Sequence, residues 1–133
     1  MYSVVKDAAR GASIALVDDS IIRGDTLRKV LPKLRASGAR AIHVRVSSPP
    51  IRYPCFMGMD FPTRRELVAH GRSIDEVRKY LGADSLIYLT VDELTNAIGT
   101  TELCTACFTG NYPFTINIDE TEIAFASDRL WEP

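Results

Sequence analysis

The feature that most constrains this chain is one run of thirteen residues, Ile14–Thr26, with the sequence IALVDDSIIRGDT. Residues 14–17 are all apolar and predict a short buried strand. Two carboxylates, Asp18 and Asp19, follow at the carboxyl end of that strand, and a loop then opens an amphipathic helix. Ligands of open α/β sheets bind outside the carboxyl ends of strands. The run therefore predicts an α/β protein with a ligand site directly after its first core strand.

The residue types in this run suit a phosphorylated ligand that is rich in hydroxyl groups. The backbone N–H groups of Ile21–Thr26 lie in a loop before a helix N-terminus, where such groups bind phosphate. The hydroxyls of Ser20 and Thr26 can donate to phosphate oxygens. The carboxylates of Asp18 and Asp19 can accept from sugar hydroxyls or coordinate Mg²⁺. We expect a site for a sugar phosphate and a divalent cation.

Simpler interpretations of the same residues exist. Adjacent aspartates after a strand often only cap the next helix, and Ser20 and Thr26 could do the same. Arg23 could be a solvated surface charge. The phosphate interpretation is favoured because the apolar strand, the acid pair, Arg-Gly and a Thr at the helix entry rarely coincide.

The run also resembles the phosphoribosyl pyrophosphate (PRPP) motif of the type I phosphoribosyltransferases, most closely that of the glutamine amidophosphoribosyltransferases. The resemblance implies that Asp18 and Asp19 bind ribose and Mg²⁺. One residue departs from the pattern: Asp25 stands where many relatives carry Thr, and its carboxylate would repel phosphate if it pointed inward. The residues implied to bind PRPP or a nucleotide are Asp18, Asp19, Ser20, Ile21, Ile22, Arg23, Gly24, Asp25 and Thr26.

Three cysteines form a second candidate site. Cys104 and Cys107 have a short chelate spacing, and Cys55 lies well upstream. From spacing alone they could bind metal, be redox-active or be small buried side chains. His43 and His70 could complete a metal set, but a place on a sheet face for His43 and a place at a helix end for His70 are the favoured interpretations.

The residues that flank the cysteines resemble the iron–sulfur class of the amidophosphoribosyltransferases. The matching segments are SSPPI with YPCFMGMD around Cys55, and ELCTACFTGNYP around Cys104 and Cys107. This resemblance implies a [4Fe–4S] cluster on those three thiols. The fourth cluster cysteine of that class precedes the PRPP motif and has no counterpart here, so we expect a partial chain.

Hydrophobic periodicity and turn signals predict the fold class. A continuous apolar run predicts a strand at 13–18, apolar alternation predicts one at 41–47, and residues 85–89 are predicted to form a third strand or an extended segment. Helical spacing and capping boxes predict helices at 25–37, 64–70, 74–81 and 91–98, with Pro32 as a kink in the first. We expect an α/β fold, namely a partial type I phosphoribosyltransferase (Rossmann-like) parallel sheet with flanking helices and an irregular C-terminal region. Residues 1–99 would be the C-terminal part of the phosphoribosyltransferase domain, with the PRPP motif at 14–26, and 100–133 a C-terminal extension.

Composition limits the possible partners. The chain has 133 residues, of which 46% are hydrophobic and 25% charged, and a formal net charge of −1. That balance is ordinary for a globular domain and supplies no general attraction for nucleic acid or an anionic membrane. No apolar run is long enough to span a bilayer, and the first residues lack a signal peptide's apolar region. We expect a cytoplasmic protein with no nucleic-acid or membrane partner.

The resemblance implies the function. Amidophosphoribosyltransferases are glycosyltransferases that make 5-phosphoribosylamine from PRPP and ammonia released from glutamine, the first step of de novo purine synthesis. The implied partners are PRPP, glutamine-derived ammonia and nucleotide inhibitors, with a homo-oligomer of the full-length enzyme, and the isolated chain is expected to be weakly active or inactive. One alternative is a non-catalytic regulatory module of the same fold that senses PRPP or a nucleotide. Another is a structural zinc module with an incidental Asp-Asp loop.

Overall fold

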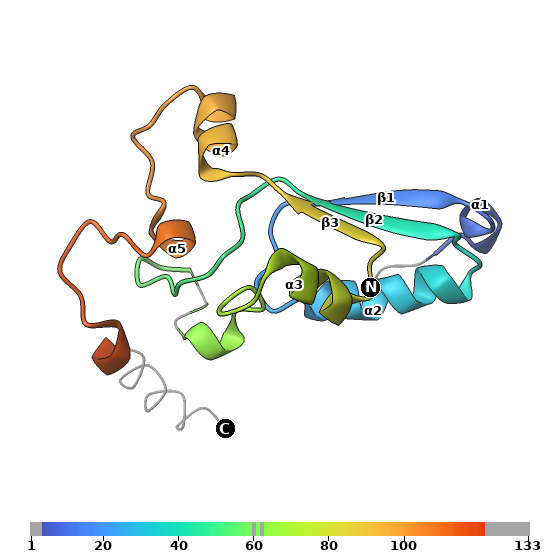
Figure 1. Ribbon diagram of the computed structural model, residues 1–133, viewed down its shortest axis with the longest axis horizontal. Helices are drawn as coiled ribbons and strands as arrows, with labels where there is room; N and C mark the ends of the chain where they lie inside the picture. Colours follow the sequence, from blue (N-terminus) through green and yellow to red (C-terminus); the bar gives the residue numbers. More distant parts are fainter. Residues whose placement is uncertain (1–3, 60, 62, 122–133) are drawn as a thin grey trace.

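A three-stranded parallel sheet organises the computed structural model, which describes residues 4–59, 61 and 63–121 (Figure 1). The strands lie in the order β1-β2-β3. β1 pairs in parallel with β2, and β2 with β3. The strands are β1 (Ser13–Asp18), β2 (Ala41–Val46) and β3 (Ser85–Tyr88). The helices are α1 (Lys6–Ala9), α2 (Asp25–Ala36), α3 (Ile74–Leu81), α4 (Val91–Ile98) and α5 (Ala106–Thr109), with a 3₁₀ turn η1 (Arg64–Glu66). This arrangement confirms the predicted α/β class.

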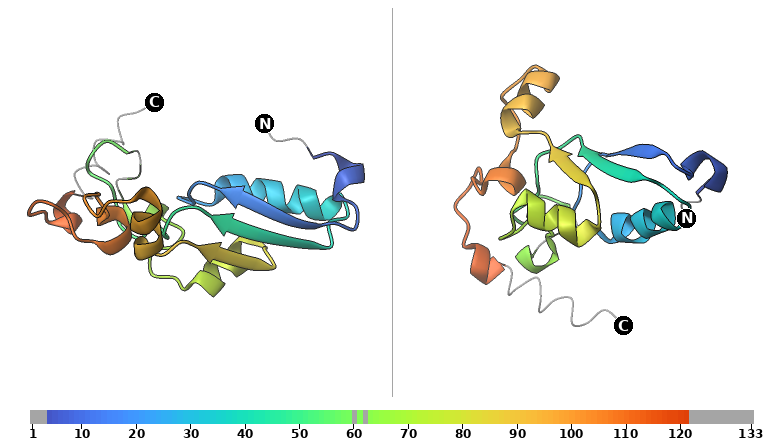
Figure 2. Two further views of the ribbon diagram at one scale, coloured as in Figure 1. Left: turned by 90° about the horizontal axis from the view of Figure 1, so that it is seen from above. Right: turned by 45° about the vertical axis from the view of Figure 1, so that its right-hand side comes forward.

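The helices α2 and α3 lie side by side against one face of the sheet (Figures 1 and 2). Their apolar stripes meet the side chains that β2 turns toward them, because alternate residues of a strand face the same side. Leu31 of α2 is 1% exposed, and Val77 of α3 and Val44 of β2 are fully buried. Truncating such a side chain to Ala costs about 2–5 kcal/mol in comparable cores. This packing fixes the position of α2, whose N-terminus borders the candidate site.

The opposite face of the sheet carries a polar ladder. The His43 Nδ1 atom lies 2.8 Å from the Ser85 hydroxyl, and its Nε2 atom lies 3.2 Å from the Ser13 hydroxyl. His43 is therefore a sheet-face residue that bridges three strands. Val17 and Ile87 on the same face remain 72% and 54% exposed.

The carboxyl ends of the strands point toward the half of the molecule that contains α4 and α5, and α1 lies at the other end (Figure 1). The loop after β1 starts from this edge at Asp19. The Ser47 N–H donates to the Asp18 carbonyl at 3.0 Å, so β2 leaves the sheet beside the acid pair. The fold thus places the predicted ligand loop where parallel sheets bind ligands.

Most predicted elements are confirmed, with one error. The helices at 74–81 and 91–98 start with the expected capping boxes, in which Ser73 pairs with Glu76 and Thr90 with Glu93. Residues 64–70 do not form a helix; only the 3₁₀ turn η1 is present. The Thr63 side chain makes no cap hydrogen bond; its hydroxyl donates to Glu66 Oε1, and Glu66 Oε2 accepts from Arg23. 

Pro32 is expected to kink the helix at 25–37. The helix α2 runs through Pro32 without interruption, although the ring removes one main-chain donor. The short helix α1 had no signal in the hydrophobic pattern. Residues 122–133 of the expected C-terminal extension lie outside the described residues.

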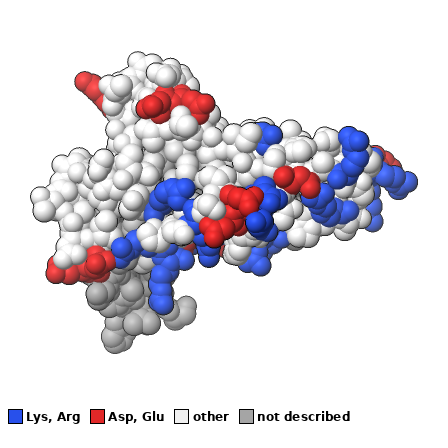
Figure 3. All heavy atoms as spheres, in the orientation of Figure 1, with Lys and Arg blue, Asp and Glu red and all other residues white. Residues whose placement is uncertain are grey.

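Charges of both signs are interspersed on the face seen in Figure 3. Lys, Arg, Asp and Glu side chains alternate along the half of the molecule formed by the sheet and α2, with no field of one sign. On this face, binding of an anion therefore depends on a local arrangement of donors.

Of the helices the structure describes, none combines the length and apolar character needed to cross a membrane.

Candidate functional site

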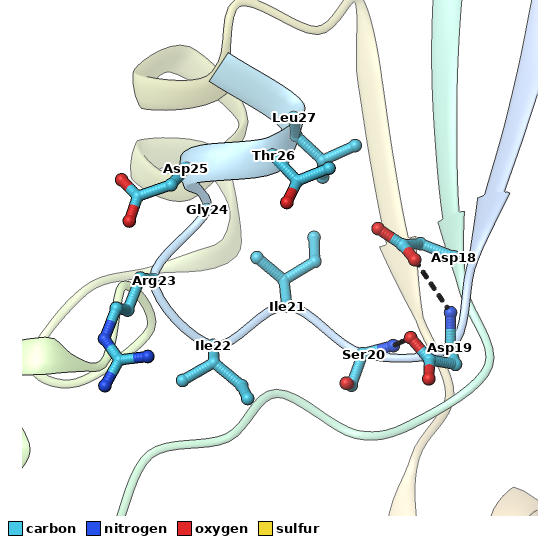
Figure 4. A pocket seen from close by; sticks show the side chains of 10 residues that line it. All are labelled: Asp18, Asp19, Ser20, Ile21, Ile22, Arg23, Gly24, Asp25, Thr26 and Leu27. Atoms are coloured by element: carbon cyan, nitrogen blue, oxygen red, sulfur yellow. Dashed lines mark hydrogen bonds between the residues drawn. The ribbon is translucent and has the colours of Figure 1, made fainter. Parts of the chain in front are cut away.

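The loop between β1 and α2 encloses a cavity of about 370 Å³. All its lining residues come from one continuous segment, Asp18–Leu27 (Figure 4). The nine residues predicted to bind PRPP are therefore brought together, and Leu27 is added to them. The Asp18 carboxylate and the Thr26 hydroxyl both extend toward the space that the loop encloses (Figure 4).

The acid pair stands at the entrance to this loop. The Asp19 N–H donates to Asp18 Oδ1 at 3.2 Å, and the Ser20 N–H donates to Asp19 Oδ1 at 2.7 Å. Partial burial raises the pKa of Asp18 above its ordinary value, opposed by the hydrogen bond from the Asp19 backbone, while the Asp19 charge raises it further. Neither carboxylate forms an ion pair with Lys or Arg in the described part of the chain. The pair is thus a local concentration of negative charge that a cation would stabilise.

The loop that lines this cavity also carries backbone donors. The N–H groups of Ile21, Ile22, Gly24, Asp25 and Thr26 have no hydrogen-bond acceptor among residues 4–59, 61 and 63–121. The last two of these belong to the first turn of α2, where the first N–H groups of a helix lack an acceptor within the helix. The helix dipole adds a partial positive charge at this end. The loop therefore offers an anion several unused donors.

Capping does not explain the hydroxyl residues of the loop. The residue that precedes α2 is Gly24, which has a left-handed conformation with φ of 80° and no side-chain cap. Neither Ser20 nor Thr26 caps the helix, so the simpler interpretation of these two residues is wrong. Their hydroxyls are available to a ligand.

Gly24 also permits a close approach of the loop to α3. A Cβ atom at this position would lie 3.0 Å from Leu81 Cδ2 and 3.8 Å from Val68 Cγ2. Real Cβ atoms rarely approach a neighbour so closely, and φ of 80° strains any side chain. The glycine predicted from the sequence is thus required for conformation and for packing.

The side chain of Arg23 is not a solvated charge. It points away from Asp18 and Asp19 (Figure 4), and its Nε donates to Glu66 Oε2 at 2.9 Å. The Nη2 atom bonds the same oxygen. The neighbouring carbonyl of Ile22 accepts a 2.8 Å hydrogen bond from the Val68 N–H. Glu66 and Val68 hold the loop from outside, and neither was predicted as a site residue.

The carboxylate of Asp25 lies on the outer side of the loop. It is exposed and points away from Asp18 and Thr26 (Figure 4). An acidic residue in the first turn of a helix interacts favourably with the helix dipole. The departure from the family pattern therefore does not place a negative charge inside the cavity.

The three cysteines gather in one region. Burial raises the pKa of the Cys107 thiol to about 11, with smaller increases from Cys55 and Cys104. The Cys107 carbonyl accepts from the N–H groups of Arg52 and Tyr53 at 2.9 and 3.0 Å, which joins α5 to the segment before Cys55. All three cysteines are unpaired thiols.

Metal binding by these thiols remains a prediction. Among the described residues, no group of three or more His, Cys, Asp or Glu side chains is arranged to hold a metal ion. The donor chemistry nevertheless fits a cluster that prefers thiolates, because three thiols lie near one another. His70 is engaged elsewhere, with its Nδ1 atom 2.7 Å from the Arg52 carbonyl.

The fold is an α/β parallel sheet with flanking helices that matches solved phosphoribosyltransferase structures. The solved glutamine PRPP amidotransferase of B. subtilis, complexed with ADP and GMP, matches with a TM-score of 0.79 and 44% identity over 86% of this chain and 27% of that one. A curated amidophosphoribosyltransferase from Pyrococcus horikoshii is 59% identical over 111 residues, 84% of this chain and 25% of its own length. The Bacillus subtilis relative is 44% identical over 123 residues, 88% of this chain and 26% of its own. The chain is a homologue of part of the amidophosphoribosyltransferases.

The extent of the match is limited. The chain spans about a quarter of the length of the curated relatives it matches. A search of protein-family models gave no match. The named relatives therefore describe this segment, and the activity of a whole protein is a separate question.

Proposed function

We propose that this chain supplies the ribose- and phosphate-binding loop of an amidophosphoribosyltransferase. In the whole protein, ammonia from glutamine would attack the ribose C1 atom of PRPP and pyrophosphate would leave, which gives 5-phosphoribosylamine. This reaction would be a glycosyl transfer and the first step of purine synthesis. The observation that carries the proposal is the acid pair beside a loop of unused N–H donors around one cavity.

Each part of this cavity has a role in binding. The 5-phosphate would lie on the N–H groups of Gly24, Asp25 and Thr26, where the helix dipole favours an anion. The ribose hydroxyls would donate to Asp18 and Asp19. Positioning of this kind contributes to catalysis by holding the reacting carbon in a fixed place.

The same carboxylates would hold Mg²⁺. Two neighbouring acids with no cationic partner in the described residues suit a hard cation that prefers carboxylate oxygen and water. When bound, Mg²⁺ would offset the charge that develops on pyrophosphate.

The cysteines would hold a [4Fe–4S] cluster through Cys55, Cys104 and Cys107, with a fourth ligand from outside this sequence. Their shared region and mutual influence on the Cys107 pKa support this proposal. A cluster would cross-link the Cys55 loop to α5. Anaerobic reconstitution followed by iron analysis and visible absorbance tests it. We expect Cys107→Ser to lower the iron content and Ser47→Ala, at an exposed serine, to leave it unchanged.

The similarity to the amidophosphoribosyltransferases supports three further proposals, on location, oligomeric state and inhibition. We propose a cytoplasmic homo-oligomer whose site also accepts nucleotides as inhibitors. The ADP and GMP in the B. subtilis structure support the last point.

Calorimetric titration with Mg²⁺ and PRPP tests the central proposal. The double change Asp18→Asn and Asp19→Asn should abolish binding because both ribose and metal contacts are lost. The control is Asp7→Asn with Asp92→Asn, which makes the same change in charge at two exposed positions outside the cavity. Equal affinity in the two double variants would contradict the site.

A further inference from the structure

Glu66 and Arg23 connect two segments that are 43 residues apart in the sequence. The Glu66 side chain is 18% exposed and the Arg23 side chain 39% exposed, so the pair is partly withdrawn from water. Hydrogen bonds between two ionised groups are stronger than neutral ones, and partial burial reduces screening. This pair therefore differs from an ordinary surface ion pair.

Both oxygens of the Glu66 carboxylate have partners. Oε2 accepts from Arg23 Nε at 2.9 Å, and Oε1 accepts from the Thr63 hydroxyl at 2.8 Å. The Thr63 contact fixes the rotation of the carboxylate. Glu66 thus accepts from Arg23 with a carboxylate that Thr63 also holds.

A second contact from the same segment acts on the adjacent residue of the loop. The Val68 N–H donates to the Ile22 carbonyl at 2.8 Å, which sets the orientation of the peptide between Ile22 and Arg23. Glu66 holds the side chain of the next residue, Arg23. The two contacts together fix the loop just before Gly24, whose own conformation starts α2.

We propose that Glu66 is a positioning residue for the anion-binding loop and acts through Arg23. It keeps the loop in the conformation in which Gly24, Asp25 and Thr26 line the cavity. It also holds the Arg23 guanidinium on the side of the loop away from Asp18 and Asp19 (Figure 4). This inference rests on the proposed function.

A double-mutant cycle in the 133-residue chain separates this role from a general effect on folding. We expect Glu66→Ala to weaken binding of Mg²⁺·PRPP about tenfold, the scale of residues that orient a ligand-binding group. Arg23→Ala should weaken it similarly, and the double variant should be no weaker than either single one, because both changes break the same contact between Glu66 and Arg23. Glu66→Gln keeps the side-chain length and one acceptor oxygen, so it should bind more tightly than Glu66→Ala. It replaces Glu66→Ala in the cycle if the Ala variant does not fold.

The matched control is Glu102→Ala, which removes an exposed glutamate outside the cavity. Binding that is unchanged in the folded Glu66 variants, or losses that add in the double variant, would overturn the inference and leave the proposed function in place. Failure of the unaltered chain to bind Mg²⁺·PRPP would overturn the proposed function and this inference with it.

Discussion

Gly24 lies against Leu81, so closely that a Cβ atom on the glycine would be 3.0 Å from Leu81 Cδ2. Gly24→Ala should destabilise the chain by about 1–3 kcal/mol through backbone strain, with the close contact as an addition. Gly11→Ala is the control, because Gly11 has φ of 71° and no atom within 4 Å of an added Cβ. Urea unfolding should show a larger loss for Gly24→Ala than for Gly11→Ala; equal losses would show that the contact with Leu81 is unimportant.

Asp84 should make stability depend on pH. Its Oδ2 accepts from the Ile42 N–H at 2.6 Å and pairs with Arg35, and the pKa of Asp84 is lowered from 3.8, chiefly by the Ile42 hydrogen bond. A lowered pKa in the folded state means that this stabilisation is present above pH 3.8 and is lost as the pH falls through the folded-state value.

The measurement is the thermal unfolding midpoint of the chain and of Asp84→Asn. We expect the variant to melt lower at neutral pH and the difference to shrink well below pH 3.8. Asp92→Asn, at an exposed acid in the first turn of α4, is the control. A difference that stays constant with pH would contradict the assignment to Asp84.

Asp25 should have little effect on ligand affinity. Its exposed carboxylate points away from the cavity, so Asp25→Asn should change the affinity for Mg²⁺·PRPP by less than about fivefold, the scale of exposed charge interactions. The titration is the same as for the acid pair. A gain much above that range would mean that the carboxylate turns inward when phosphate approaches.

The capping box at Ser73 should stabilise α3. The Ser73 hydroxyl accepts from the Glu76 N–H at 3.3 Å, and the Glu76 carboxylate accepts from the Ser73 N–H at 2.7 Å. Ser73→Ala should cost about 1 kcal/mol in urea unfolding. Thr115→Ala, at an exposed position, should cost much less. Equal effects would mean that the cap contributes nothing measurable.

The sequence was sufficient for those features that depend on neighbouring residues. Period-two alternation around Val44 and the capping residues Ser73 and Thr90 predicted a strand and two helix starts that the structure contains. The cavity could also be predicted, because its lining is one continuous segment, Asp18–Leu27.

Features that depend on distant pairing could not be predicted. Glu66 lies three residues after Thr63, which is the spacing of a capping box, and nothing local distinguishes a box from an ion pair with a residue 43 positions away. Glu66 pairs with its tertiary partner Arg23, and only the turn η1 stands where the helix at 64–70 was predicted. Val68 contributes through its backbone N–H, which its side chain does not indicate.

An amide ¹H–¹⁵N NMR titration of the chain with ribose 5-phosphate and Mg²⁺ locates the ligand site residue by residue. We expect the largest shifts in Asp18–Thr26, with the N–H signals of Gly24, Asp25 and Thr26 moving as a phosphate accepts from them. Shifts that centre on another part of the chain, or no shifts at saturating ligand, would show that this loop is not the ligand site.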